Sequence, residues 1–159
     1  MKKNDIIFSY TGYERIKEDE TFFRTVKAPK ITGYKDLLKS TIMLTSTIMV
    51  DISKIPKEIL KMPDLKISED TQTWLNILKT GVLAYGLDEN LAKYRKRKKS
   101  ASSSKIKSTL GIWKVYREYQ MMGRIKSLYY TFLHAINAAK KRILVIDSIR
   151  KLAENILEK

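Results

Sequence analysis

The sequence contains no cysteine and only one histidine, His134. The absence of cysteine excludes disulfide bonds and thiolate metal sites, and it is compatible with a reducing compartment. A single imidazole leaves little material for histidine-based catalysis or for a metal site built from histidines. The longest apolar stretch with little charge, residues 127–139, is too short to cross a bilayer. We therefore expect a protein without a membrane span, either free in solution or bound at a membrane surface.

Acidic residues are scarce in the second part of the chain, which makes the charge distribution uneven. Residues 1–90 contain 14 Lys/Arg and 13 Asp/Glu, whereas residues 91–159 contain 18 Lys/Arg and 4 Asp/Glu. The second part therefore carries nearly all of the net charge of +15. Such asymmetry favours an anionic partner, either nucleic acid or the surface of an acidic membrane, over the simpler alternative of a solvated basic face.

The order of the predicted elements indicates an α/β fold. Residues 5–16 and 21–29 hold β-forming residues in partial alternation and predict a hairpin, and residues 34–39 predict a short helix. Residues 40–51 are rich in β-branched side chains and too apolar for an exposed edge, so we expect a buried strand in the second half of this segment. Two further short strands are expected on either side of an Asp-Glu pair: residues 82–87 and 90–95.

An acidic pair opens the next predicted helix. Glu69 and Asp70 follow Ser68, whose hydroxyl can cap a helix, and Gly81 stands where a helix-ending glycine belongs. The helix dipole favours acids in the first turn, so a capping role is the simplest interpretation of the pair. The same dipole keeps a carboxylate ionised, which also suits a general base. Spacing alone does not choose between the two. The apolar residues of this helix repeat at helical spacing: Trp74, Leu75 and Leu78.

After Arg95 the sequence becomes basic and helical. A basic, serine-rich loop over residues 96–105 precedes two amphipathic helices, one over about 104–122 and one from Arg124 onward, separated by Gly123. We place His134 in a core or an interface, with no partner evident from the sequence. The aromatic residues lie at the spacing of a helical core rather than of an exposed platform that stacks on bases, which argues against nucleic acid. They are Trp113, Tyr116, Tyr129, Tyr130 and Phe132.

Residues 63–102 carry a series of linked motifs: PDLKISEDTQTWLNILKTGVLAYGLDENLAKYRKRKKSAS. The series contains an acidic pair ending in Asp, a Trp-Leu helix, Leu-Lys-x-Gly, Tyr-Gly-Leu, a Tyr-Arg pair and a trailing Ser-x-Ser. In this order the motifs resemble family 2 glycosyltransferases, particularly bacterial enzymes that build surface polysaccharides of the teichuronic-acid type. The resemblance covers nearly the whole chain, because further segments match in order: FSYTGYERI, YKDLLK, TSTIMVD, IWKVYREYQ and IKSLYYTFLHAINAAKKRI.

The resemblance implies a fold and a set of site residues. The fold is a partial GT-A-like α/β domain, a mixed sheet with flanking helices over residues 1–103, followed by a basic amphipathic helical tail over residues 104–159. In this family the Asp of the acidic pair is the general base that deprotonates the acceptor hydroxyl, a role that falls on Asp70, with Glu69 beside it. Guanidinium groups suit phosphate oxygens because they offer paired donors, although a solvated basic loop remains the alternative. The residues implied near the donor diphosphate are Arg95, Arg97, Ser100 and Ser102.

The nucleotide-binding half of the family has no counterpart in the sequence. There is no glycine-rich phosphate loop and no Asp-x-Asp motif, which in the family holds a divalent cation, Mn²⁺ or Mg²⁺, on the sugar-nucleotide diphosphate. Met1 falls just past the place of that motif. We therefore expect the C-terminal, acceptor-side half of an inverting glycosyltransferase of cell-surface polysaccharide synthesis, from a split or truncated reading frame and inactive alone. The sugar nucleotide and the cation belong to the complete enzyme.

These expectations extend to partners and location. A partial sheet leaves edges and apolar faces that a second chain carrying the missing half, or another copy of this chain, would cover. The acceptor implied for the complete enzyme is lipid-linked or a free saccharide. We expect a cytoplasmic protein that binds peripherally to the anionic inner face of the membrane, in a salt-sensitive manner. Two alternatives remain open: a basic nucleic-acid-binding protein, which is the weaker, and a non-catalytic membrane-surface or scaffold module.

Overall fold

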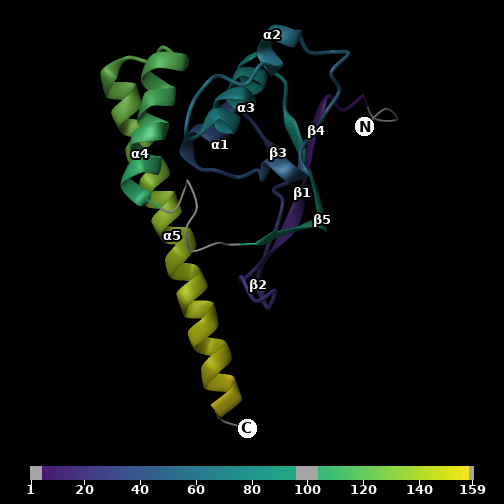
Figure 1. Ribbon diagram of the computed structural model, residues 1–159, viewed down its shortest axis with the longest axis vertical. Helices are drawn as coiled ribbons and strands as arrows, with labels where there is room; N and C mark the ends of the chain where they lie inside the picture. Colours follow the sequence, from purple (N-terminus) through teal and green to yellow (C-terminus); the bar gives the residue numbers. More distant parts are fainter. Residues whose placement is uncertain (1–4, 96–103, 158–159) are drawn as a thin grey trace.

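The computed structural model describes residues 5–95 and 104–157, and side chains up to residue 141. It consists of a sheet with short helices on one face, and a pair of helices that packs against them (Figure 1). Helices α1 (Tyr34–Lys39) and α3 (Glu69–Lys79) lie between the sheet and the pair formed by α4 (Lys105–Lys114) and α5 (Arg124–Leu157). This arrangement confirms the predicted α/β class with a mixed sheet flanked by helices.

The sheet is mixed and built around β1 (Phe8–Ile16). β1 pairs antiparallel with β2 (Phe22–Val26), which confirms the predicted hairpin, and parallel with β5 (Ala84–Arg95). The two-residue strand β3 (Ile31–Thr32) borders β5, and β4 (Met49–Val50) pairs with the start of β1. The parallel pairing of β1 and β5 requires a long crossover, and the chain makes it through α1, α2 (Lys57–Leu60) and α3.

The core lies between the sheet and helices α1 and α3. Phe8 of β1 is fully buried and meets Trp74 of α3, with ring centroids 5.7 Å apart. Tyr10 is also buried, and its hydroxyl donates to the carbonyl of Pro29 (2.8 Å) and lies 2.6 Å from the Thr32 hydroxyl. The polar end of this tyrosine is therefore satisfied inside the core. The helices contribute aliphatic side chains: Leu37, Leu38, Leu75, Ile77 and Leu78.

Two strand predictions are wrong. The expected buried strand in residues 40–51 is reduced to β4, and Met49 within it is exposed; a 3₁₀ turn, η2 (Thr45–Thr47), stands where the strand should run. There Thr47 donates its hydroxyl to the carbonyl of Leu44 (2.7 Å), and such local bonds compete with strand pairing. The two short strands expected over residues 82–87 and 90–95 are one strand, β5, whose register with β1 shifts at the Asp-Glu pair. A bulge thus takes up the polar pair without ending the strand.

The helices of the second part follow the expected order, but α5 exposes the face that was expected in the core. α4 continues into a π-helical turn, η3 (Val115–Tyr119), and α5 begins after Gly123, as predicted. Tyr116 is buried as expected, and its hydroxyl donates to the carbonyl of Leu38 in α1 (2.6 Å). The prediction of core positions is wrong for Tyr129 and Phe132, which are 56% and 63% exposed. Small polar side chains of α5, Ser127 and Thr131, face the core instead. The periodicity of the sequence therefore identified an apolar stripe on α5 but not which side of the helix packs on the core.

Candidate functional site

The acidic pair lies in the first turn of α3, as the sequence predicts. Gly81 follows the helix with a positive φ of 94°, the conformation of a helix-ending glycine. Ser68 differs from the prediction: it holds the cap position, but its φ of 70° is left-handed and its side chain accepts no capping hydrogen bond. A capping side chain needs an extended backbone to reach the amides of the first turn. The start of α3 therefore depends on other groups, among them Asp70.

Asp70 is half-buried and held by two neighbours. Its Oδ2 accepts a hydrogen bond from the Thr45 hydroxyl (2.7 Å), and its Oδ1 accepts one from the backbone N–H of Thr71 (2.6 Å). Thr45 lies in η2, so the turn that replaced the predicted strand supplies the tether. Oδ1 also accepts from the Thr71 hydroxyl (3.3 Å), so Oδ1 accepts two hydrogen bonds and Oδ2 accepts the one from Thr45. The arrangement thus serves the local fold and also fixes the orientation of a carboxylate that can take a proton.

Sequence reasoning did not find Thr45 or the polar contact behind α3. Gln120, after η3, donates from Nε2 to the side-chain oxygens of Gln72 and Asn76, both at 2.9 Å, and accepts from the Tyr34 hydroxyl at 2.8 Å. Gln72 and Gln120 are buried, so this network ties the helix that carries Asp70 to the helical part of the chain. The spacing of Gln72 and Asn76 by four residues was the available signal, because it places both amides on one helix face.

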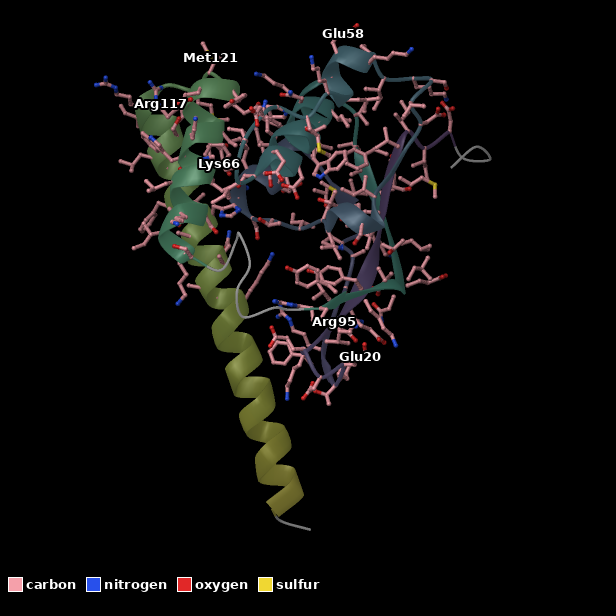
Figure 2. The ribbon with its side chains drawn as sticks, viewed as in Figure 1. Glu20, Glu58, Lys66, Arg95, Arg117 and Met121 are labelled. Carbon is pink, nitrogen blue, oxygen red and sulfur yellow. The ribbon has the colours of Figure 1, made fainter. Side chains whose placement is uncertain are left out.

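The residues predicted near the donor diphosphate are only partly within the described structure. Arg97, Ser100 and Ser102 lie outside the described residues. Arg95 ends β5 and forms an ion pair with Glu20 in the β1–β2 turn. Figure 2 shows this pair at the opposite end of the sheet from Glu58 of α2. A role of these four residues in donor binding remains a prediction.

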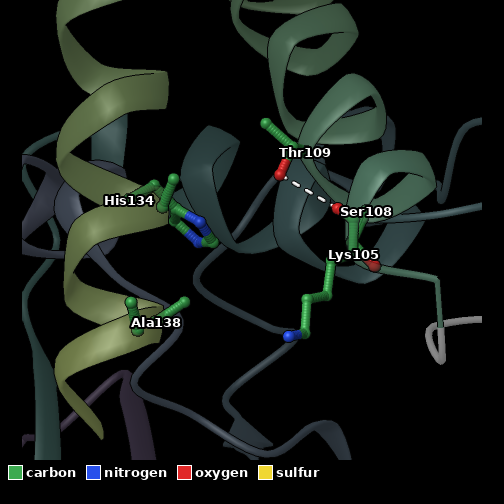
Figure 3. Close-up of a pocket in the computed structure, with 7 residues that line it drawn as sticks. Lys105, Ser108, Thr109, His134 and Ala138 are labelled. Atoms are coloured by element: carbon green, nitrogen blue, oxygen red, sulfur yellow. Dashed lines mark hydrogen bonds between the residues drawn. The ribbon is translucent and has the colours of Figure 1, made fainter. Parts of the chain in front are cut away.

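A cavity of about 410 Å³ lies elsewhere, between α4 and α5 (Figure 3). His134 lines it, and its Nε2 lies 3.1 Å from the Thr41 hydroxyl, so the histidine has the partner that the sequence did not reveal. Burial, and secondarily the positive charge of Lys141, lower the pKa of His134 to about 4, which keeps the imidazole neutral at pH 7. The cavity contains neither acid of the pair. Its lining consists of Lys105, Ser108, Thr109, His134, Ala135, Ala138 and Ala139.

The described part of the chain lacks both a cluster of metal-binding side chains and a membrane-spanning helix. Within residues 5–95 and 104–157, no cluster of three or more His, Cys, Asp or Glu side chains is arranged to hold a metal ion. No helix in the same part of the chain combines the length and the apolar character of a membrane span.

Comparison with known proteins gives relatives of a single kind. No family model and no solved structure matches the chain. A teichuronic acid biosynthesis glycosyltransferase of Bacillus subtilis is 37% identical over 144 residues, which cover 90% of this chain and 56% of the relative. The chain is homologous to part of a bacterial glycosyltransferase.

Two further relatives support this relationship. The glycosyltransferase from Escherichia coli named UDP-Glc:alpha-D-GlcNAc-diphosphoundecaprenol beta-1,3-glucosyltransferase is 30% identical over 89% of the chain, and a glycosyltransferase of Haemophilus influenzae is 26% identical over 86%. The chain spans about half the length of these curated glycosyltransferases. The relatives confirm the predicted resemblance to glycosyltransferases of surface-polysaccharide synthesis and agree with family 2.

Proposed function

We propose that the chain forms the acceptor-side part of an inverting, sugar-nucleotide-dependent glycosyltransferase of cell-surface polysaccharide synthesis. The observation that carries this proposal is Asp70. It is the acid that the family motif marks as the base, it lies in the first turn of α3, and Thr45 and Thr71 fix its carboxylate. A general base must be held in the orientation from which it takes the proton, and these two contacts hold the Asp70 carboxylate in place.

In the proposed reaction, Asp70 accepts the proton of an acceptor hydroxyl as that oxygen attacks the anomeric carbon of the donor sugar. A new carbon–oxygen bond forms on one face, while the bond to the nucleoside diphosphate breaks on the opposite face, so the configuration inverts. Thr45 is a positioning residue, because its hydroxyl donates to Oδ2 and limits rotation of the carboxylate. Glu69 stands beside Asp70 and is assigned to the acceptor side.

The donor side is proposed to require residues beyond those described. A Mn²⁺ or Mg²⁺ ion on the donor diphosphate would supply charge neutralisation in the complete enzyme, where we assign its ligands to the donor half. We assign Arg95, Arg97, Ser100 and Ser102 to contacts with the diphosphate. Arg95 must then leave its ion pair with Glu20. Both side chains of this pair are exposed, so the ion pair is weak. A chain carrying the donor half, or a second copy of this one, is the proposed partner.

The proposed acceptor is lipid-linked or a free saccharide, and the proposed location is the cytoplasmic face of the membrane. The Escherichia coli relative supports the lipid-linked option, because its name includes a diphosphoundecaprenol acceptor. The positive charge of the second part of the chain suits a surface of anionic lipid.

A hybrid enzyme tests the proposal. The part of the Bacillus subtilis relative that this chain does not match is joined to the chain, and transfer from radiolabelled UDP-sugars to membrane acceptors is measured. The proposal predicts transfer by the hybrid and none by either part alone. A hybrid that folds and binds UDP-sugar, but never transfers sugar, would contradict the assignment of this chain as the acceptor side.

A further inference from the structure

Helix α5 exposes its apolar side. Ile125, Leu128, Tyr129 and Phe132 are 87%, 64%, 56% and 63% exposed, and their spacing places them on one face of the helix. We call these four residues the α5 stripe. The other side of the helix packs on the core with Ser127 and Thr131, which are both buried. A helix normally buries its apolar stripe, so the orientation of α5 leaves a surface that needs a partner.

Polar contacts from the α1–η2 region fix this orientation. Asn137 donates to the carbonyl of Lys39 in α1 (3.0 Å), and the Lys141 ammonium donates to the Ser40 hydroxyl and to the carbonyl of Thr41, both at 2.7 Å. These tethers come from the same side of α5 as Ser127 and Thr131. Rotating the helix to bury the stripe would break them, so the α5 stripe is held facing outward.

The surroundings of the α5 stripe are positive. Residues 104–141 contain eight Lys/Arg and a single acid, Glu118. Arg124, Lys126 and Lys140 on α5 itself are exposed. Met121 is also exposed and lies at the tip of the α4–α5 pair, four residues before the stripe begins (Figure 2). A second copy of this chain docked symmetrically on this face would bring together two surfaces of like charge, which disfavours self-association.

We propose that the α5 stripe inserts into the surface of an anionic lipid membrane, with α5 lying along that surface. The apolar side chains enter the boundary between headgroups and acyl chains, where aromatic residues such as Tyr129 and Phe132 are favoured. The neighbouring cations contact the anionic headgroups. Membrane binding then needs both the apolar side chains and the cations, and removing the apolar side chains weakens binding as much as removing the cations. This proposal stands independently of sugar transfer.

Vesicle flotation of the full chain tests the insertion. The test variant is Leu128→Gln with Phe132→Gln, and the matched control is Ile52→Gln with Leu91→Gln, two equally exposed apolar residues of the sheet part. The expected result is binding to phosphatidylglycerol-containing vesicles that falls about tenfold or more in the test variant and stays unchanged in the control. Because both test positions are exposed, the thermal unfolding temperature should not change. Equal vesicle binding by the test variant and the wild type would overturn the proposal.

Site-specific labelling gives a second readout that does not depend on the double variant. The chain has no cysteine, so Phe132→Cys and Ile52→Cys each create a single attachment site for a polarity-sensitive fluorophore. The label at position 132 should shift to the blue on anionic vesicles and be quenched by spin-labelled lipid, whereas the label at position 52 should not respond. No blue shift at position 132 on bound vesicles overturns insertion. Absent vesicle binding, combined with tight and salt-sensitive binding to duplex DNA, would assign the face to nucleic acid instead.

Discussion

Acidification should destabilise this chain through His134. The imidazole is half-buried between α4 and α5, with its Nε2 beside the Thr41 hydroxyl. Two cations stand near it: Lys141 on its own helix and Lys105 across the cavity. Burial and the charge of Lys141 lower its pKa from 6.5 to about 4. Protonation would add a further positive charge to a site in which burial and the Lys141 ammonium already disfavour one.

The sign and size of the effect follow from linkage. Above the unfolded pKa of 6.5, both states hold a neutral imidazole and the group has no effect on stability. As the pH falls from 6.5 toward about 4, the unfolded chain binds a proton that the folded chain does not, so the free energy of unfolding decreases. A pKa difference of this size corresponds to a loss of roughly 3 kcal/mol, complete below the folded pKa.

Urea unfolding at a series of pH values measures this loss. His134→Gln is the matched variant, because its amide can still bond to Thr41 but does not titrate in this range. Between about pH 7 and about pH 4.5, the wild type should lose roughly 2 kcal/mol more than the variant. Parallel stability profiles for the two proteins would refute a half-buried, neutral His134 and the packing of α5 on the α1–η2 region.

Two further predictions concern the core and the donor. Tyr116→Phe should lower the free energy of unfolding by about 1 kcal/mol, because it removes the hydroxyl that donates to a buried carbonyl of α1. Tyr129→Phe should change the free energy of unfolding little, because Tyr129 is exposed. Urea unfolding measures both, and an equal cost at the two positions would contradict the burial of Tyr116. The 159-residue chain alone should not bind UDP-sugars with Mn²⁺ at micromolar concentration in calorimetric titration, since its sequence contains no Asp-x-Asp motif for the donor's cation. Micromolar binding would show that the donor side is misplaced.

Local signals in the sequence predicted the elements that depend on local interactions. The hairpin of β1 and β2, helix α1, the extent of α3 with Gly81 after it, and the break at Gly123 all follow from alternation, helical spacing and glycine chemistry. The strand expected after Ser40 failed because propensity does not register competing hydrogen bonds of threonine side chains, such as that of Thr47.

Interactions between distant segments could not be predicted in this way. The tether from Thr45 to Asp70 joins residues 25 positions apart, and the bond between Tyr34 and Gln120 spans 86 positions. The same limit explains α5: its periodicity defines an apolar stripe, but only the contacts of Asn137 and Lys141 with distant backbone and side-chain groups decide that the stripe faces outward.

The assignment of Asp70 as the base is tested most directly by transfer rates in the hybrid enzyme. Asp70→Asn keeps the shape of the side chain, and its amide oxygen can still accept one of the two hydrogen bonds, from the Thr45 hydroxyl or from the Thr71 N–H, but it cannot take the proton of the acceptor. The account predicts a fall in the transfer rate of about 100-fold or more with unchanged donor binding, and a much smaller fall for Glu69→Gln. A near-normal rate for Asp70→Asn together with an inactive Glu69→Gln would contradict it.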